Sequence, residues 1–396
     1  MKKNLLFVMP SLSAGGGEKS LVNLLSQVDY NSYNVDLLLF HKNGIFLNLL
    51  PKQVNVIEPL GDYTTFKYPL NHAVRKFIKK NKFHLALGRL IFALKNRAIK
   101  DTSRAEQYTW KYQSRSINVL EKEYDAAIGY LEKSAIYFVV DKVKSKRKIG
   151  WIHTNYTNSG MDGYFDQPYF NQLNQIVTVS EECARSLNEN FKGIDDKVKV
   201  IYNIVSPTLI HQLADNPIKD SLSAGPNETS LITIARLSYE KGIDIAIRAC
   251  EKLVNKGYKI KWHVLGEGNE RDRLEEMIRK KGLEDHFILL GLRENPYPYV
   301  KMGDIYIQPS RYEGKSIAID EAKILHKPII VTNYETAKDQ ITNEINGLIV
   351  DMTEKGLSEG IERLIQKQDL KRSLINNLSN EQLGTENEIN KLYEII

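Results

Sequence analysis

The chain has 396 residues, of which 42% are hydrophobic and 26% are charged. This composition excludes wholesale disorder, and the length predicts two domains with cores of their own. Two cysteines are too few for a disulfide framework or a cysteine-rich zinc site, and they fit a reducing, cytoplasmic setting. The formal net charge of +6 is a mild excess for this length, so its distribution along the chain is more informative than its size.

The first part of the chain alternates strand and helix patterns, which is typical of an open, mostly parallel sheet covered by helices. Residues 5–9 are predicted to form a buried strand, since their apolar stretch is too short for a signal peptide. A glycine-rich loop over 10–17 and a helix over 18–28 follow. Further strands are expected over 35–40, 126–130, 148–153, 175–180 and 198–201. No apolar run reaches the ~18–20 residues of a membrane-spanning helix.

A change of character over residues 206–228, with three prolines and few periodic apolar positions, predicts a linker. A second alternating series begins after it. Strands are expected over 230–234, 261–265, 287–290, 305–308 and 328–332, and helices over 243–255, 271–281, 296–302 and 316–325. We therefore expect an N-terminal Rossmann-like domain over residues 1–205, a C-terminal one over 206–382, and a terminal helix over about 383–396.

The positive charge is concentrated in residues 67–115, which contain 13 Lys and Arg against two acidic residues, or +11, so the rest of the chain sums to −5. Apolar residues recur in this segment at helical spacing: Val74, Phe77 and Ile78, then Leu87, Leu90, Ile91 and Leu94. Helices packed on the domain, helices docked on an anionic membrane surface and a nucleic-acid site are all compatible with the charge. The apolar residues disfavour nucleic acid, because phosphate binding does not require them.

Three short motifs lie between a predicted strand and a predicted helix. The glycines at 15–17 allow the backbone to approach a phosphate, or form a tight turn. Arg236 and Lys241 are two cations able to clamp a diphosphate, although a pair of solvated surface charges has the same spacing. Gly266 and Gly268 form a Gly-x-Gly pattern that is weak on its own.

The fourth motif surrounds Glu313. Gly314, Lys315 and Ser316 suggest a phosphate-binding P-loop, but Pro309 stands where that motif needs its first glycine. Glu313 precedes a predicted helix that also contains Glu321. Carboxylates accept hydrogen bonds from vicinal hydroxyl groups, and a helix N-terminus favours anionic oxygens. The pattern therefore suits a ligand with hydroxyls at both ends and phosphates between them, or simply a helix with an acidic start.

Together these motifs resemble the retaining glycosyltransferases of family 4, of the bacterial cell-surface polysaccharide type. The order and spacing of the Gly15–Gly17 loop, the Arg236/Lys241 pair, Gly266 and the Glu313/Glu321 pair carry the resemblance, which covers nearly the whole chain. It implies an α/β GT-B fold, in which two Rossmann-like domains face a central cleft. It also implies that the terminal helix crosses back onto the N-terminal domain.

The resemblance further implies a role for each motif. Arg236 and Lys241 would bind the donor diphosphate, Glu313 the hydroxyls of the donor sugar and Glu321 those of the ribose. His153, at the end of a strand, would lie beside the transferred sugar. The expected catalytic residues are His153, Arg236, Lys241 and Glu313, and the remaining donor-binding residues are Gly16, Gly17, Gly266, Gly314, Lys315, Ser316, Ile317 and Glu321.

The expected activity is transfer of a hexosyl or N-acetylhexosaminyl group from a nucleotide sugar, in the first place a UDP-sugar. The expected acceptor is a hydroxyl of a cell-surface glycan or a lipid-linked saccharide. No Asp-x-Asp motif is present, so no metal or other cofactor is expected, and Arg236 and Lys241 would supply the positive charge. We expect a cytoplasmic protein that binds no nucleic acid, and residues 67–115 are expected either to dock on the inner membrane face or to pack on the domain. An epimerase of the same fold and a non-enzymatic basic binding protein remain as alternatives.

Overall fold

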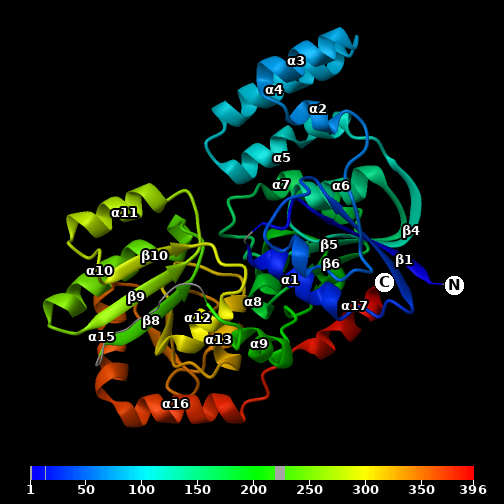
Figure 1. Cartoon of the computed structure of the whole chain (residues 1–396). Helices are drawn as coiled ribbons and strands as arrows, with labels where there is room; N and C mark the ends of the chain where they lie inside the picture. The colour runs from blue at the N-terminus through cyan, green and yellow to red at the C-terminus, as the bar shows by residue number, and fades with distance from the viewer. Residues whose placement is uncertain (1, 14, 219–227) are drawn as a thin grey trace. The chain divides into compact units, whose positions relative to one another are not determined.

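The computed structural model describes residues 2–13, 15–218 and 228–396, and it divides into two compact units (Figure 1). The first unit holds residues 2–13, 17–202 and 388–396, and the second holds residues 15–16 and 203–387. Each unit is built around one parallel β-sheet with connecting helices, which confirms the expected α/β class with two Rossmann-like halves.

The sheet of the first unit has seven parallel strands in the order β3-β2-β1-β4-β5-β6-β7. Residues Leu5–Met9 of β1 are all inaccessible to solvent, as expected of a parallel strand covered on both faces. The strands span Lys3–Met9 (β1), Tyr33–Leu39 (β2), Asn55–Ile57 (β3), Leu120–Gly129 (β4), Val143–Ile152 (β5), Gln175–Thr178 (β6) and Val198–Val200 (β7).

The connecting helices of this unit are Gly16–Ser26 (α1), Ser134–Lys142 (α6), Gly163–Asn171 (α7) and Glu181–Asn190 (α8). Helix α17, Ile389–Ile395, belongs to the same unit although it comes almost 200 residues later in the chain. The Tyr393 ring stacks on the Tyr33 ring with 5.2 Å between centroids, and the Tyr393 hydroxyl accepts a hydrogen bond from the Asp29 N–H at 2.8 Å. These contacts tie the returning helix to the beginning of β2.

The basic segment forms four consecutive helices between β3 and β4: Tyr63–Lys67 (α2), Leu70–Lys79 (α3), Phe83–Ala98 (α4) and Thr102–Gln113 (α5). Figure 1 shows α3 and α4 lying side by side and antiparallel, on the far side of α5 from the sheet of this unit. A small core of their own, which includes Phe66, Phe77 and Leu85, holds these helices together.

The sheet of the second unit has six parallel strands in the order β10-β9-β8-β11-β12-β13. They span Thr229–Ile234 (β8), Ile260–Leu265 (β9), Phe287–Gly291 (β10), Ile305–Gln308 (β11), Ile329–Thr332 (β12) and Leu348–Val350 (β13). The helices are Pro207–Ala214 (α9), Ile243–Asn255 (α10), Arg271–Lys280 (α11), Tyr297–Met302 (α12), Ile317–Ile324 (α13), Ala337–Gln340 (α14), Glu354–Gln366 (α15) and Gln368–Asn380 (α16). Short 3₁₀ turns occur at Leu47–Leu49, Ser114–Ser116, Asp195–Lys197, Tyr239–Lys241 and Glu386–Glu388.

The linker prediction is wrong for part of residues 206–228. Pro207 begins helix α9, because a proline in the first turn of a helix loses no intrahelical hydrogen bond, and Ile210 and Ala214 are buried in the second unit. Residues 219–227 lie outside the described part of the chain. The second unit begins at Asn203, three residues before the expected boundary, because the Thr385 hydroxyl donates to the Asn203 carbonyl at 2.7 Å and accepts from the Val205 N–H at 2.8 Å.

Candidate active site

The candidate site of the second unit lies where the strand order of its sheet reverses. The chain proceeds from β8 outward to β9 and β10, and then returns to β11 on the other side of β8. Where the strand order reverses, the loops after two neighbouring strands run in opposite directions and leave a crevice between them. Ligands of this architecture usually bind in that crevice, at the carboxyl ends of the strands. Arg236 and Lys241 follow β8, Gly266 follows β9 and Glu313 follows β11, so the predicted residues emerge at this edge.

A close approach of two loops at Gly242 defines the geometry of the site. Gly242 adopts a left-handed φ of +65°, and a Cβ atom there would lie 2.0 Å from the Pro309 carbonyl oxygen. Only glycine fits this contact without displacement. A backbone hydrogen bond, which the Arg311 N–H donates to the Glu240 carbonyl at 2.7 Å, also joins these two loops. The loop after β8 is therefore held against the loop after β11.

This contact brings together two residues that are 72 positions apart. The Lys241 Nζ atom donates to Oε2 of Glu313 at 2.6 Å, and the side chains are 22% and 7% exposed. The other carboxylate oxygen of Glu313 accepts hydrogen bonds from Gln308 Nε2 at 2.8 Å and from the Ser310 hydroxyl at 2.7 Å. A carboxylate has about four acceptor positions, so these three donors leave one position at Oε2 for a ligand.

Sequence reasoning missed Gln308 and Ser310, which fix the Glu313 carboxylate. Both are buried, and the Tyr306 hydroxyl donates to Gln308 Oε1 at 2.7 Å, which directs the amide nitrogen of Gln308 toward Glu313. The available signal was a glutamine at the end of an otherwise apolar strand. A buried amide needs partners, and its position at the carboxyl end of β11 indicates where they lie.

Arg311 was also missed, and it stabilises the same junction. Its guanidinium donates to both carboxylate oxygens of Asp244 at 2.8 Å and to the Tyr239 carbonyl at 2.7 Å, and it lies 4.1 Å from the centre of the Tyr239 ring. Burial acts to raise the pKa of Asp244, but hydrogen bonds from Arg311 and Arg248 outweigh it and hold that pKa below its usual value. Asp244 therefore remains a carboxylate at neutral pH.

Arg236 differs from Lys241 in being exposed, and within the described residues its side chain forms no ion pair. The adjacent Ala235 is covered by Gly266, whose φ is +149° and whose Cβ atom, if present, would lie 1.9 Å from the Ala235 carbonyl oxygen. The glycine at 266 thus allows the loop after β9 to lie directly beside Arg236. This leaves a cation accessible at the same edge as the Lys241–Glu313 pair.

Not all of the predicted donor-binding residues after Glu313 are available to a ligand. The Lys315 side chain is only 11% exposed and its Nζ lies 3.8 Å from Asp320 Oδ2, so it neither points to solvent nor extends freely toward a ligand. The Ser316 N–H, predicted to receive a ligand, donates to Gln340 Oε1 at 2.8 Å. Gly314 lies before α13, and Ile317 is its first residue.

Glu321 lies in the second turn of α13 and is 1% exposed. Its Oε1 accepts the Tyr297 hydroxyl at 2.8 Å, and this carboxylate raises the pKa of Tyr297 further, in addition to the effect of burial. The structure therefore places the Glu321 carboxylate in a buried contact with Tyr297. The described residues contain no group of three His, Cys, Asp or Glu placed to hold a metal ion.

The first unit has its own polar cluster at the carboxyl ends of β4 and β5, beside the start of α1. Gly17 lies there, and a Cβ atom on it would be 3.7 Å from His153 Cδ2 and 3.1 Å from a methyl group of Leu131. Gly16, one residue earlier, has no atom within 4 Å of such a Cβ and is exposed. Of these two glycines, Gly17 is therefore the one that lies next to His153.

His153 is held by two hydrogen bonds. Its backbone N–H donates to Glu132 Oε1 at 2.8 Å, and its Nε2 lies 3.1 Å from the Tyr130 carbonyl oxygen. A carbonyl oxygen only accepts, so Nε2 must have the hydrogen. Burial lowers the pKa of His153 to about 4, so the ring is neutral at pH 7 and Nδ1 is left as an acceptor. This imidazole can receive a hydroxyl hydrogen but does not supply a proton.

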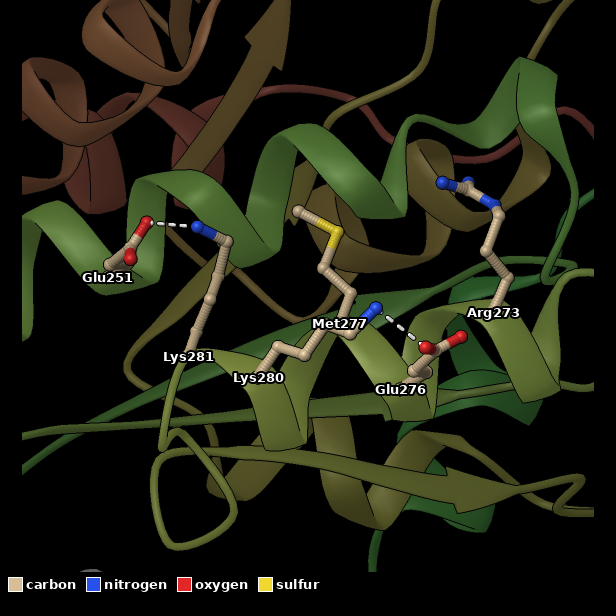
Figure 2. Close-up of a pocket in the computed structure, with 6 residues that line it drawn as sticks. All are labelled: Glu251, Arg273, Glu276, Met277, Lys280 and Lys281. Carbon is tan, nitrogen blue, oxygen red and sulfur yellow. Dashed lines mark hydrogen bonds and ion pairs between the residues drawn. The ribbon is translucent and has the colours of Figure 1, made fainter.

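A surface depression between α10 and α11 is a different kind of feature (Figure 2). Its charged side chains are paired with one another or with a neighbour. Lys281 contacts Glu251 at 2.6 Å and Lys280 contacts Glu276 at 2.6 Å, as Figure 2 shows, and Arg273 Nε donates to Glu270 at 2.7 Å. This depression offers no unsatisfied charge to a ligand.

Residues 215–381 match the model of the family described as glycosyl transferases group 1. The chain is 26% identical over 216 residues to poly(ribitol-phosphate) alpha-N-acetylglucosaminyltransferase of Staphylococcus aureus, a match that covers 52% of this chain and 41% of that protein. It is 24% identical over 226 residues to N-acetylgalactosamine-N,N'-diacetylbacillosaminyl-diphospho-undecaprenol 4-alpha-N-acetylgalactosaminyltransferase of Campylobacter jejuni, covering 56% of this chain and 59% of that one. The chain spans about half the length of the curated relatives it matches.

Among solved structures, HepE of Anabaena in complex with UDP superposes with a TM-score of 0.66 at 16% identity, and the match covers 100% of this chain and 99% of that one. At this identity the likeness shows the fold, which confirms the GT-B prediction. The Lys241–Glu313 pair at the switch point of the second unit lies within the family match over residues 215–381. Residues 215–381 are therefore similar in sequence to glycosyl transferases of group 1, and the chain has the GT-B fold.

Proposed function

We propose that the protein is a retaining, metal-independent glycosyltransferase that uses a UDP-sugar and requires no cofactor. The single observation that carries this proposal is the Lys241–Glu313 ion pair at the switch point, in the same loop as the exposed Arg236. Two cations and one immobilised carboxylate at such an edge suit a ligand with an anionic diphosphate and a sugar with free hydroxyls.

Arg236 and Lys241 would bind the diphosphate of the donor. As the bond between the sugar C1 and the phosphate oxygen breaks, negative charge grows on that oxygen, and fixed cations lower the barrier by stabilising it. In a retaining front-face reaction the acceptor hydroxyl attacks C1 from the side of the leaving group. Its oxygen forms the new bond and its proton passes to the departing phosphate, so the electron balance needs neither an enzyme nucleophile nor a metal.

Glu313 would orient the donor sugar. Gln308, Ser310 and Lys241 immobilise its carboxylate, and the remaining acceptor position at Oε2 would take one sugar hydroxyl. The same contacts hold Lys241 in place before the donor binds. The pair would therefore position the sugar and the diphosphate relative to each other.

The remaining assignments follow the family resemblance. His153, with its free Nδ1, would accept a hydroxyl of the transferred sugar, and Gly16 and Gly17 would leave space for the donor phosphate. Gly266, Gly314, Lys315, Ser316 and Ile317 would line the donor site of the second unit. Glu321 would bind the ribose hydroxyls, which requires the donor to share or displace the hydrogen bond from Tyr297.

The proposed acceptor is a hydroxyl of a cell-surface glycan or of a lipid-linked saccharide. The relative in Staphylococcus aureus is named for poly(ribitol-phosphate), and the relative in Campylobacter jejuni for a diphospho-undecaprenol saccharide. Transfer of a hexosyl or N-acetylhexosaminyl group fits both names. The solved HepE structure with UDP supports a uridine nucleotide as the donor.

The test begins with a thermal-shift panel of nucleotide sugars, since a ligand bound to the folded state raises its unfolding temperature. The best donor is then assayed for nucleotide release with and without glycan acceptors, with EDTA present. We expect Lys241→Ala to lower turnover by orders of magnitude without changing the fold, and Lys252→Ala, an exposed lysine on α10, to behave as wild type.

Near-normal turnover of a folded Lys241→Ala protein would refute the assignment of this residue. Donor consumption without any acceptor would identify an epimerase instead, and failure of every nucleotide sugar to raise the unfolding temperature would favour a non-enzymatic binding protein. The anomeric configuration of the product, measured by NMR, separates retention from inversion.

A further inference from the structure

Helix α4 of the first unit leaves a line of large apolar side chains uncovered. Four of them follow one another at spacings of four, three and four residues, which places them on one side of the helix. The exposed fractions are 62% for Phe83, 59% for Leu87, 40% for Leu90 and 68% for Leu94. On the opposite side of α4, Leu85 and the partly buried Phe92 pack into the small core shared with α2 and α3. An exposed line of this kind marks an interaction surface.

All charged residues of helices α3 and α4 are basic, and the acidic Asp101 follows Lys100 after the end of α4. Lys79 ends α3 and Lys80 follows it in the turn before Phe83, and Arg97 and Lys100 come after Leu94. Asp62 pairs with Lys80 and Lys82, whereas Lys79, Arg97 and Lys100 are exposed and form no ion pair within the described residues. Cations therefore stand at both ends of the line.

The dimensions fit a helix that lies flat on a surface. Phe83 and Leu94 are eleven residues apart, or ~16 Å along a helix that rises ~1.5 Å per residue. Ile78 near the end of α3 is a further large apolar side chain of this hairpin, and it is 48% exposed. The cations at the two ends would reach anionic groups at the level of the lipid headgroups, while the apolar side chains enter the acyl boundary.

We propose that the α3–α4 hairpin is a docking surface for an anionic lipid bilayer, into which Phe83, Leu87, Leu90 and Leu94 insert. Charge complementarity selects this occupant. A second copy of the chain would bring two acid-free, positively charged surfaces together, which like-charge repulsion opposes. Nucleic acid would satisfy the cations but would leave the apolar line in water. The inference rests on the hairpin alone and does not depend on the proposed activity.

The test is co-sedimentation of the full chain with vesicles of phosphatidylcholine alone and of phosphatidylcholine mixed with phosphatidylglycerol, at low and high salt. We expect binding to the anionic vesicles that weakens as salt rises. The double variant Leu87→Glu/Leu94→Glu should lose binding by about tenfold or more. Leu209→Glu/Ile345→Glu is the matched control, because it makes the same charge change at exposed apolar positions of the second unit.

A fluorescent variant reports insertion directly. All three native tryptophans, Trp110, Trp151 and Trp262, are at most 1% exposed, so Leu94→Trp adds an exposed indole to a buried background. Its emission should shift to shorter wavelength with anionic vesicles, and that of Leu209→Trp should not. Unfolding temperatures of all variants, measured without lipid, separate loss of docking from loss of folding.

Equal vesicle binding by wild type and Leu87→Glu/Leu94→Glu would overturn the proposal, and so would wild-type binding that ignores lipid charge and salt. A dimer that the double variant dissociates, together with no vesicle binding, would assign the apolar line to a second copy. Salt-sensitive binding of an oligonucleotide without vesicle binding would assign the cations to nucleic acid.

Discussion

Replacing Gly242 by alanine tests the loop contact on which the candidate site depends. An added Cβ would lie 2.0 Å from the Pro309 carbonyl oxygen, whereas real Cβ atoms stay at least 3.0 Å from such neighbours. The loop after β8 must therefore retreat by about 1 Å from the loop after β11. The left-handed φ of +65° adds ~1–2 kcal/mol for any residue with a Cβ, and the displacement adds ~1–3 kcal/mol of overpacking.

The chain offers a control that separates these two effects. Gly282 has nearly the same backbone conformation, with φ +62°, but no atom lies within 4 Å of its would-be Cβ. Gly282→Ala should therefore show only the backbone term of ~1–2 kcal/mol. Urea unfolding of both variants, compared by midpoint and slope, should place Gly242→Ala lower in stability by a further ~1–3 kcal/mol.

Gly242→Ala and Gly282→Ala should differ more in turnover than in free energy of unfolding. A retreat of about 1 Å would lengthen the 2.6 Å Lys241–Glu313 contact beyond hydrogen-bonding distance, and a misplacement of that size costs ~100-fold in rate. Acceptor-dependent nucleotide release by Gly242→Ala should fall by about this factor, while Gly282→Ala should retain wild-type turnover. Indistinguishable stability and turnover of the two variants would refute the argument from loop contact.

Two further predictions concern Arg311 and His153. Arg311→Ala should lower the free energy of unfolding by ~2 kcal/mol, because Asp244 loses a bidentate partner, and a double-mutant cycle with Asp244→Ala should give a coupling above ~0.5 kcal/mol. The His153 pKa of about 4 lies below its unfolded value near 6.5, so the unfolded chain binds the extra proton first as pH falls. Stability should therefore be greatest above pH 6.5 and fall toward pH 4, by up to ~3 kcal/mol, and His153→Asn should flatten that slope in pH-dependent urea unfolding. An equal slope in both proteins, or additivity of the Arg311 and Asp244 variants, would contradict these assignments.

Much of the second unit was predictable because its strands are buried on both faces. Apolar runs such as those of β11 and β12 identify buried parallel strands, and the motif around Glu313 comes shortly after β11. Arg311 was missed because its partners Asp244 and Tyr239 lie about 70 residues away in the sequence. Gln308 and Ser310 are close to Glu313 in the sequence, but their hydrogen bonds to it depend on how the loop after β11 folds. No local pattern encodes a loop-to-loop approach such as that of Gly242 and Pro309.

Periodicity in the basic segment predicted amphipathic helices but not which side of them is covered. Phe77 is buried and Leu87 and Leu94 are exposed, although all three were equally apolar positions in the sequence. Helix α4 has a second apolar side, with Leu85 and Phe92, and tertiary packing selects that side for the core. Similarly, the prolines after residue 206 indicated a linker between domains. In the structure Pro207 begins helix α9, which is held in the second unit by the buried Ile210.

The place of helix α17 has a consequence for biosynthesis. The first unit includes Glu388–Ile396, so 186 positions separate Tyr202 from the segment that completes it. At ~5–20 residues per second, a ribosome needs roughly ten to forty seconds to cover that distance. Throughout this interval Tyr33 lacks the ring that stacks on it, and the Asp29 amide lacks its acceptor. The first unit therefore remains incomplete during synthesis of the second unit, and the surface around Tyr33 and Asp29 stays uncovered until α17 has been made.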